Sequence, residues 1–256
     1  GVAGTSGKST VTGMIGWILH ILGEDPTVMN GAVMKNFVGD DAPYVSALVG
    51  AGLPFVSEVD ESDGSIAGYW PKIAVLNNVS LDHKSLDELR DLFGTFIAKA
   101  DNAVINIDNE DGAVLAMALP DDRVTSFSIG GEADLVASNL AERPFGIDFD
   151  VATRDGKTAH VKLQVPGRHN ASNALAAIGA AIAAGITLED AAKAIGGFVG
   201  LRRRMELVGE EGGVSVIDDF GHNPDKIGAT LDTLHAFPGR LLLLFQPHGY
   251  GPLKMM

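Results

Sequence analysis

Cysteine is absent from the 256 residues of this chain. Without thiols, the chain can form neither a disulfide framework nor a metal site built from thiolates. This absence fits a protein of the reducing cytosol, and we predict a cytoplasmic location.

Basic residues are scarce: 19 Lys and Arg stand against 33 Asp and Glu, giving a formal net charge of −14. Nucleic acids and anionic membranes are bound by basic surfaces that displace counterions. We therefore expect neither as a partner. An anionic ligand would need a local cluster of donors.

Long hydrophobic runs are also missing. The longest strongly apolar stretch, residues 174–186, is too short to span a bilayer, and its Ala-rich and Gly-rich composition predicts a buried helix. We expect no membrane insertion. No charged leader precedes the first motif, but residue 1 already lies inside that motif, so we expect the natural N-terminus to lie further upstream.

The first half of the chain alternates short β-rich runs with helical spacing. Strands are predicted at residues 27–30, 55–59, 73–77 and 103–107, and helices at residues 8–22 and 86–99. Such alternation predicts an α/β fold with a mostly parallel sheet flanked by helices. Residues 124–129, 146–153 and 159–165 have strand composition without intervening helices, and we interpret them as an antiparallel annex.

The second half predicts a change of domain near residue 200. A helix is expected over 170–184, and a capping box at Thr187 predicts another that ends near Ile195, before a glycine cluster. A strand at 214–217, a helix at 224–235 and a strand at 241–245 would form one βαβ unit. We therefore predict one domain at 1–200, whose start is truncated, and the beginning of a second, Rossmann-like domain at 201–256.

A glycine-rich loop opens the first predicted helix with the sequence Gly4-Thr5-Ser6-Gly7-Lys8-Ser9-Thr10. Glycines let backbone N–H groups converge on phosphate oxygens, the lysine neutralises the β and γ phosphates, and the Ser9 hydroxyl can reach Mg²⁺. Val2 stands where the strict motif has glycine. The alternative interpretation is an ordinary glycine-rich turn before a helix.

Acidic and polar residues follow the next two predicted strands. Residues 57–64 read SEVDESDG, and residues 77–83 end in Asp82 and His83. Ligand sites of open α/β sheets form at the carboxyl ends of strands, where a carboxylate could hold Mg²⁺. A solvated acidic loop and a structural histidine are the alternatives for each segment by itself. Together with the glycine-rich loop, these two segments make three elements at successive strand ends. We expect all three to converge on one crevice.

These blocks, in this order, resemble the Mur ligases, particularly the alanine-adding ligases and the murein-peptide ligases. The resemblance covers almost the whole chain, and the motifs that carry it are residues 4–10, 58–63, 82–83, 166–173, 198–205, 218–224 and 245–248. It implies a central P-loop ATPase domain followed by part of a C-terminal domain. The N-terminal domain that grips the UDP moiety in the family is absent from these residues.

The resemblance also implies roles for individual residues. Those implied to bind the nucleotide are Gly4, Thr5, Ser6, Gly7, Lys8, Ser9, Thr10, Asn170, Asn173, Arg204 and Asp218; the metal ligands would be Ser9, Glu58 and His83. Substrate contacts would be Glu61, Ser62, Asp63, His222 and His248, and the catalytic set Lys8, Glu58, His83, Arg204 and His222. Asn170 and Asn173 could instead cap and pack their helix, and Arg204 could be an ordinary basic hinge.

The activity implied is ligation with ATP and Mg²⁺. The γ-phosphoryl group passes to a carboxylate, an acyl phosphate forms, and an amine displaces phosphate. The partners would be a UDP-sugar, UDP-N-acetylmuramate, and L-alanine or a peptide. Gly249 replaces the arginine of alanine-adding ligases, so the acceptor stays open. A paralogue with another acceptor, a P-loop ATPase or ATP-binding module without ligase activity, and a noncatalytic scaffold are the alternatives.

Overall fold

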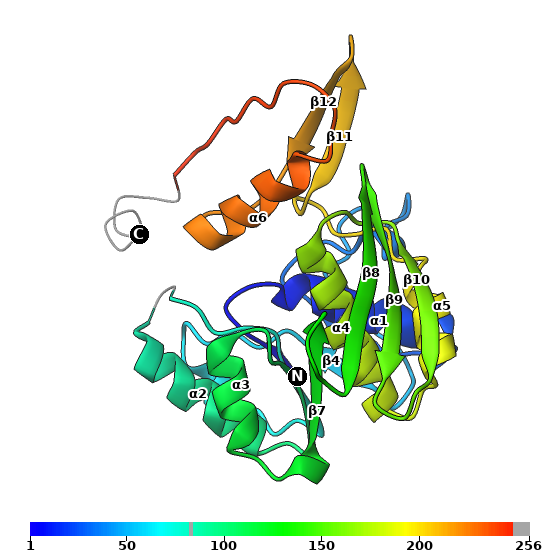
Figure 1. The fold of residues 1–256 in the computed structure, drawn as a ribbon. Coiled ribbons are helices and arrows are strands. Elements are labelled where there is room, and N and C mark those ends of the chain that lie inside the picture. The colour runs from blue at the N-terminus through cyan, green and yellow to red at the C-terminus, as the bar shows by residue number, and fades with distance from the viewer. Residues whose placement is uncertain (82–83, 248–256) are drawn as a thin grey trace.

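The computed structural model describes residues 1–81 and 84–247. Its main sheet has the strand order β1-β5-β6-β7-β8-β9-β10, and Val2 of β1 forms a parallel bridge to Glu58, which follows β4. Through that bridge the sheet continues into the smaller sheet β3-β2-β4 (Figure 1). The strands are β1 Val2–Ala3, β2 Thr27–Met29, β3 Ala47–Leu48, β4 Phe55–Ser57, β5 Ile73–Leu76, β6 Asn102–Asn106, β7 Val124–Ile129, β8 Leu135–Arg143, β9 Gly146–Thr153 and β10 Thr158–Leu163.

Helices cover both faces of this sheet. Figure 1 shows α1 Lys8–Ile21, α4 Arg168–Ala183 and α5 Leu188–Ile195 on one side, and α2 Leu86–Ala98 and α3 Glu110–Met117 on the other. The side chains of central strands alternate between the two: Val75 and Val104 pack with the first group, whereas Ala74 and Ala103 pack with the second. The predicted mostly parallel α/β sheet is confirmed.

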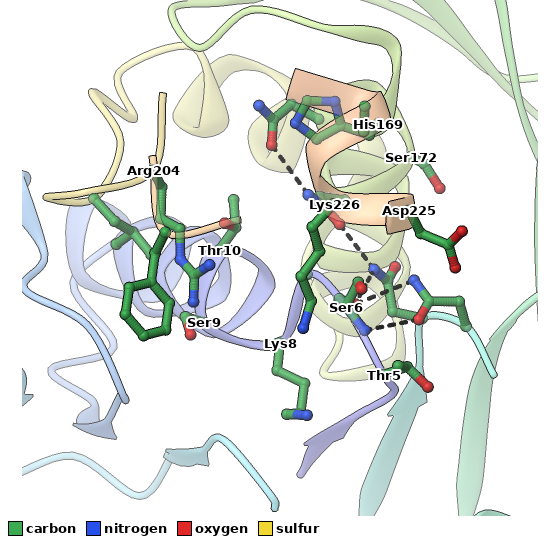
Figure 2. Close-up of a pocket in the computed structure, with 18 of the residues that line it drawn as sticks. Thr5, Ser6, Lys8, Ser9, Thr10, His169, Ser172, Arg204, Asp225 and Lys226 are labelled. Carbon is green, nitrogen blue, oxygen red and sulfur yellow. Dashed lines mark hydrogen bonds between the residues drawn. The ribbon is translucent and has the colours of Figure 1, made fainter. Parts of the chain in front are cut away.

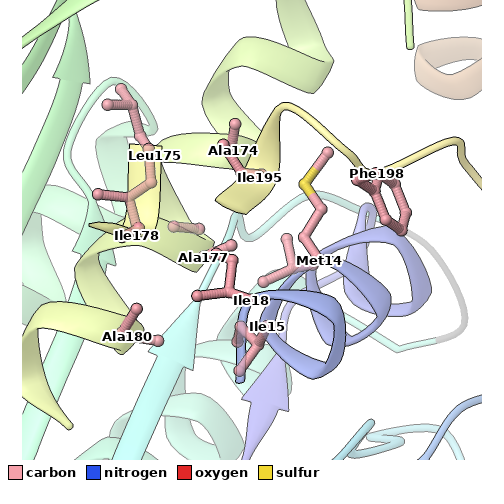
Figure 3. Close-up of a cluster of buried hydrophobic side chains, with 14 of the residues drawn as sticks. Met14, Ile15, Ile18, Ala174, Leu175, Ala177, Ile178, Ala180, Ile195 and Phe198 are labelled. Atoms are coloured by element: carbon pink, nitrogen blue, oxygen red, sulfur yellow. The ribbon is translucent and has the colours of Figure 1, made fainter. Parts of the chain in front are cut away.

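Helix α4 lies at the centre of the larger core. Ala174 and Ala177 of α4 lie beside Met14 and Ile18 of α1, as Figure 3 shows. Ala174, Ala177 and Ile178 are fully buried, so small side chains let the two helices approach closely. The buried helix expected within residues 174–186 is confirmed up to Ala183, where α4 ends.

The interpretation of residues 124–129 as part of an antiparallel annex is wrong. Strand β7 runs parallel to both β6 and β8, and only the pairs β8–β9 and β9–β10 are antiparallel. The parallel pairing of β6 and β7 is made possible by α3, a crossover helix that the sequence analysis missed. Strand β8 was missed as well.

The C-terminal part also differs from the prediction. Strand β12 Val214–Asp218 and helix α6 Pro224–Leu234 are present, but β12 pairs antiparallel with β11 Glu206–Glu211, so the two form a hairpin instead of opening a βαβ unit. The strand predicted at 241–245 is not formed. This segment is paired with no strand in the described part of the chain, and its five side chains are exposed. A strand without a ladder partner gains no inter-strand hydrogen bonds.

Candidate functional site

The phosphate loop lies between β1 and α1, where the sequence places it. Gly4 and Gly7 adopt positive φ angles of 129° and 85°. A Cβ atom on Gly4 would lie 3.0 Å from both the backbone N and O of Asn78, so the loop passes directly against the end of β5. Only glycine fits this close approach without strain.

Lys8, the first residue of α1, turns its ammonium back over the loop. Its Nζ donates to Gly4 O and to Glu61 Oε2, each at 2.8 Å. The two charged side chains are 15% and 4% exposed, so the ion pair is largely removed from water. Glu61, predicted to contact substrate, therefore contacts the lysine of the phosphate loop.

Polar side chains gather where β4, β5 and β6 end. Glu58, Asn77 and Asn106 occupy these strand ends and line one pocket with the phosphate loop. Glu58 Oε2 accepts a hydrogen bond from Gly31 N at 2.8 Å, which fixes the carboxylate beside the loop after β2. The predicted convergence at one sheet edge is present for the described residues.

This pocket has a volume of about 590 Å³ and is closed on its far side by the β12–α6 segment. Figure 2 shows Arg204, which precedes β11, and Lys226 of α6 directed toward the loop that carries Lys8 and Ser9. Predicted residues that line it are Thr5, Ser6, Gly7, Lys8, Ser9, Thr10, Glu58, Glu61, Ser62, Asn170, Asn173, Arg204 and His222. The pocket therefore brings together most of the predicted site.

Asn170 and Asn173 join a chain of buried amides at the start of α4. Asn170 Nδ2 donates to Pro166 O at 2.7 Å, Asn173 Nδ2 donates to Asn170 Oδ1 at 3.0 Å, and Asn77 Nδ2 donates to Asn173 Oδ1 at 2.9 Å. These contacts pack the two asparagines against each other, whereas the N-cap of α4 is Gly167 and makes no side-chain cap hydrogen bond. Both still line the pocket, so nucleotide binding by their remaining donors and acceptors stays a prediction.

Arg204 is a partly buried cation from the C-terminal part. Burial lowers the pKa of its guanidinium, and the nearby carboxylates of Asp219 and Glu58 act in the opposite direction. An arginine keeps its charge in such surroundings because its ordinary pKa lies far above neutral pH. Its guanidinium carbon lies 5.2 Å from the centre of the Phe220 ring, which supports the side chain from one side.

Two predicted carboxylates are not part of the pocket wall. Asp218 pairs with Arg203 at 3.5 Å on the half-exposed end of β12. The residue after it, Asp219, lines the pocket and accepts from Met205 N and Gly221 N at 2.9 and 2.8 Å. Asp63 caps its own turn by accepting from Ser65 N, and these hydrogen bonds lower its carboxyl pKa.

The comparisons with known proteins agree with this geometry. The model of the Mur ligase middle domain matches residues 2–181, and that of the "Mur ligase, glutamate ligase domain" matches residues 203–253. The chain belongs to the Mur ligase family. A UDP-N-acetylmuramate–L-alanine ligase from Dictyoglomus turgidum is 37% identical over 97% of this chain, and one from Streptomyces avermitilis is 38% identical over 96%.

Solved structures of Mur ligases have the same fold. A UDP-N-acetylmuramate–alanine ligase from Thermotoga maritima superposes with a TM-score of 0.79 and 28% identity, covering 92% of this chain and 54% of its own. A murein peptide ligase from Psychrobacter arcticus superposes with a TM-score of 0.73 and 30% identity. The match covers 90% of this chain and 53% of that ligase. This chain matches 54% of the length of each of the two ligases from Dictyoglomus and Streptomyces. The chain thus spans about half the length of the Mur ligases it matches.

Two predicted residues of the Mur ligase site, His83 and His248, lie outside the described residues. Within residues 1–81 and 84–247, no group of three or more His, Asp or Glu side chains could hold a metal ion. Ser9 and Glu58 do share the pocket. No helix among these residues has both the length and the apolar character needed to cross a membrane.

The polar pocket residues that sequence reasoning missed include Asn77, Asn78, Asp219 and Lys226. The first two directly follow a predicted strand, so their position at the sheet edge was a usable signal. Lys226 lies on α6, and its Nζ is 3.4 Å from His222 Nε2. The sequence offers no comparable signal for Lys226, because its approach to the loop depends on how α6 lies over the sheet.

His169 packs where α4 meets α6. A Cβ atom on Gly167 would lie 2.7 Å from His169 Cε1 and 2.4 Å from Thr233 Oγ1, so the imidazole lies in a tight seam. Burial lowers the pKa of His169 below its ordinary value of 6.5, although Asp219 acts to raise it. The ring is therefore neutral in the folded chain at neutral pH.

We expect His169 to make stability depend on pH. Below pH 6.5 the unfolded imidazole binds a proton that the folded one does not, so unfolding becomes easier as the pH falls from 7 toward 5. One such group contributes a slope of at most about 1.4 kcal/mol per pH unit. Denaturant unfolding at several pH values should show a shallower slope for His169→Asn. The same slope in the unmodified protein and in His169→Asn would contradict this expectation. His20→Asn, at an exposed position, serves as the control.

Proposed function

We propose that this chain is the nucleotide-binding part of an ATP-dependent amide ligase. The observation that carries the proposal is the pocket in which Lys8 from the phosphate loop and Arg204 from the C-terminal part lie with Ser9 and Glu58. Two cations on opposite walls suit a triphosphate, whose charge must be held in a protein of net charge −14.

ATP would be held by the backbone of residues 4–10 and by Lys8, with Arg204 at the γ-phosphate. The left-handed glycines Gly4 and Gly7 leave room for phosphate oxygens against the backbone. Ser9 and Glu58 fit Mg²⁺, because this ion takes one or two protein oxygens and completes its shell with water and phosphate. When bound, Mg²⁺ would neutralise charge on the phosphates.

The reaction proposed has two steps. The γ-phosphoryl group moves from ATP to a substrate carboxylate, which gives ADP and an acyl phosphate. An amine then attacks the acyl carbon, releases phosphate and loses a proton as the amide forms. His222 lines the pocket and is the candidate to orient or deprotonate that amine, while Lys8 and Arg204 stabilise charge on the transferring group.

UDP-N-acetylmuramate is proposed as the carboxylate substrate and L-alanine as the amine. The support is the similarity to UDP-N-acetylmuramate–L-alanine ligases at 37% and 38% identity. A Mur ligase with a different amine acceptor is the alternative, favoured by Gly249, which replaces the arginine of alanine-adding ligases. We place this chemistry in the cytoplasm, where precursor sugars and ATP meet.

Phosphate release by the full protein tests this proposal. With ATP, Mg²⁺ and UDP-N-acetylmuramate present, we expect release to require an added amine, with L-alanine, glycine and an alanyl peptide compared in parallel. Removing Mg²⁺ with EDTA should stop it. Release that is independent of any amine would instead identify an ATPase, and a protein that binds no nucleotide would have to be assigned another role.

A further inference from the structure

Two asparagines hold the phosphate loop from the side of β5. The carbonyl of Ser6 accepts hydrogen bonds from Asn77 Nδ2 at 2.9 Å and from Asn78 Nδ2 at 3.2 Å. Ser6 N donates to Asn78 Oδ1 at 2.8 Å. Both ends of this residue are thus fixed by the segment that follows the strand.

This contact sets the direction of the next peptide group. In a trans peptide the C=O and the following N–H point to opposite sides of the chain. Since the Ser6 carbonyl faces Asn77 and Asn78, the N–H of Gly7 faces away from them. It can then join the free N–H groups of the first turn of α1, which begins at Lys8.

The amide orientation of Asn77 is determined at both ends of the amide chain. At one end Asn170 must donate to the Pro166 carbonyl, so its oxygen accepts from Asn173 and the oxygen of Asn173 faces Asn77. At the other end the Ser6 carbonyl also requires a donor. Reversing Asn77 would set its oxygen against two acceptors at once.

Asn77 is also costly to keep where it lies. The residue is 4% exposed, and among the described residues its Oδ1 atom has no hydrogen-bond partner. A buried polar atom without a partner destabilises a fold by roughly 1–3 kcal/mol. A Cβ atom on Gly7 would come within 2.2 Å of Asn77 Nδ2, so the side chain lies directly against the loop. Stabilisation of the fold does not explain an asparagine at this buried position, whereas its hydrogen bond to the phosphate loop does.

We infer that Asn77 is a positioning residue for the phosphate loop. It holds the Ser6–Gly7 peptide so that the Gly7 N–H is directed to a bound phosphate, and it ties this peptide to Asn173 at the start of α4. The inference rests on the proposed function, since it needs a phosphate ligand in the loop. Asn77 would act through the backbone and would contact no reacting atom.

Binding of ATP, ADP and adenosine to the full protein, measured by calorimetry, separates positioning from general stability. Asn77→Ala should weaken ATP and ADP by at least about 10-fold, because a directed phosphate contact is charge-assisted. Adenosine, which lacks phosphates, should bind within about twofold of its affinity for the unmodified protein. The matched control is Asn36→Ala, because the Asn36 side chain also makes two hydrogen bonds, to Gly197 O and from Val199 N, and lies outside the pocket.

Asn77→Asp tests the same contact if the alanine variant fails to fold. Its carboxyl keeps the shape of the amide but donates only when protonated, so ATP affinity relative to the unmodified protein should recover as the pH is lowered from 8 to 6. Unchanged ATP affinity in Asn77→Ala, or a pH-independent Asn77→Asp, would overturn the inference, as would equal losses for ATP and adenosine. An unmodified protein that binds no ATP would remove the proposed function and this inference with it.

Discussion

Replacing Lys8 by alanine is expected to abolish ligation. The side chain reaches over the phosphate loop, and its ammonium is the charge that neutralises the β and γ phosphates in the proposed mechanism. Removing a group of this kind commonly lowers the rate on the order of 10²-fold or more. Single-turnover formation of ADP from ATP and the carboxylate substrate measures this loss directly, and turnover equal to that of the unmodified protein would refute the assignment.

A double variant distinguishes a loss of ATP binding from a loss of folding stability. Lys8→Ala leaves Glu61 buried without its cation, and breaking a buried pair in this way costs roughly 3–5 kcal/mol. The double variant Lys8→Ala/Glu61→Gln removes the uncompensated charge, so we expect it to regain stability against urea without regaining ATP binding. Glu61→Gln alone should still bind ATP, because Lys8 remains. Lys193→Ala, at an exposed position on α5, is the control for loss of a positive charge.

Gly7→Ala is expected to disable nucleotide binding completely. The φ angle of 85° at Gly7 is strained for any side chain, at a cost of about 1–2 kcal/mol. The added Cβ atom would also lie 2.2 Å from Asn77 Nδ2 and 2.5 Å from Asn173 Oδ1. Both neighbours belong to the buried amide chain and cannot withdraw without breaking it. The loop must therefore shift, and with it the N–H groups proposed to bind phosphate.

Gly23 provides the matched control for this variant. Its φ angle of 84° is nearly the same, but nothing lies within 4 Å of a Cβ atom placed on it. Gly23→Ala should therefore show only the cost of backbone strain and should leave ATP affinity unchanged. Thermal unfolding and ATP titration of the two variants give the comparison. If Gly7→Ala bound ATP as tightly as Gly23→Ala, the steric argument for the loop would be wrong.

Two of the predicted helices begin at strong end signals, but the end signal at Asn109 was not enough to reveal α3. Helix α2 begins at a capping box formed by Ser85 and Glu88, and α5 begins at Thr187, whose side chain accepts from Asp190 N. In α3, by contrast, Gly112 is the only buried residue, so no apolar stripe marks it. Missing this crossover led directly to the wrong orientation for residues 124–129.

The pocket shows a different limit of sequence reasoning. Side chains alternate along β12, so adjacent Asp218 and Asp219 face different surroundings, and the motif alone does not tell which one faces the ligand. The amide chain of Asn77, Asn173 and Asn170 joins residues up to 96 positions apart. Its residue types were visible in the sequence, but the polarity of its hydrogen bonds depends on two backbone carbonyls that only the folded chain brings together.

The close contact between α4 and α1 links the geometry of the pocket to the size of a few alanines. The first turn of α4 carries Asn170 and Asn173, while Ala174 and Ala177 further along the same helix have no free space beside them. A larger residue at either alanine would push α4 away from α1, and both asparagines would move with the helix. Variants that impair the proposed nucleotide site should therefore be sought in the apolar interior of the chain as well as among its polar residues.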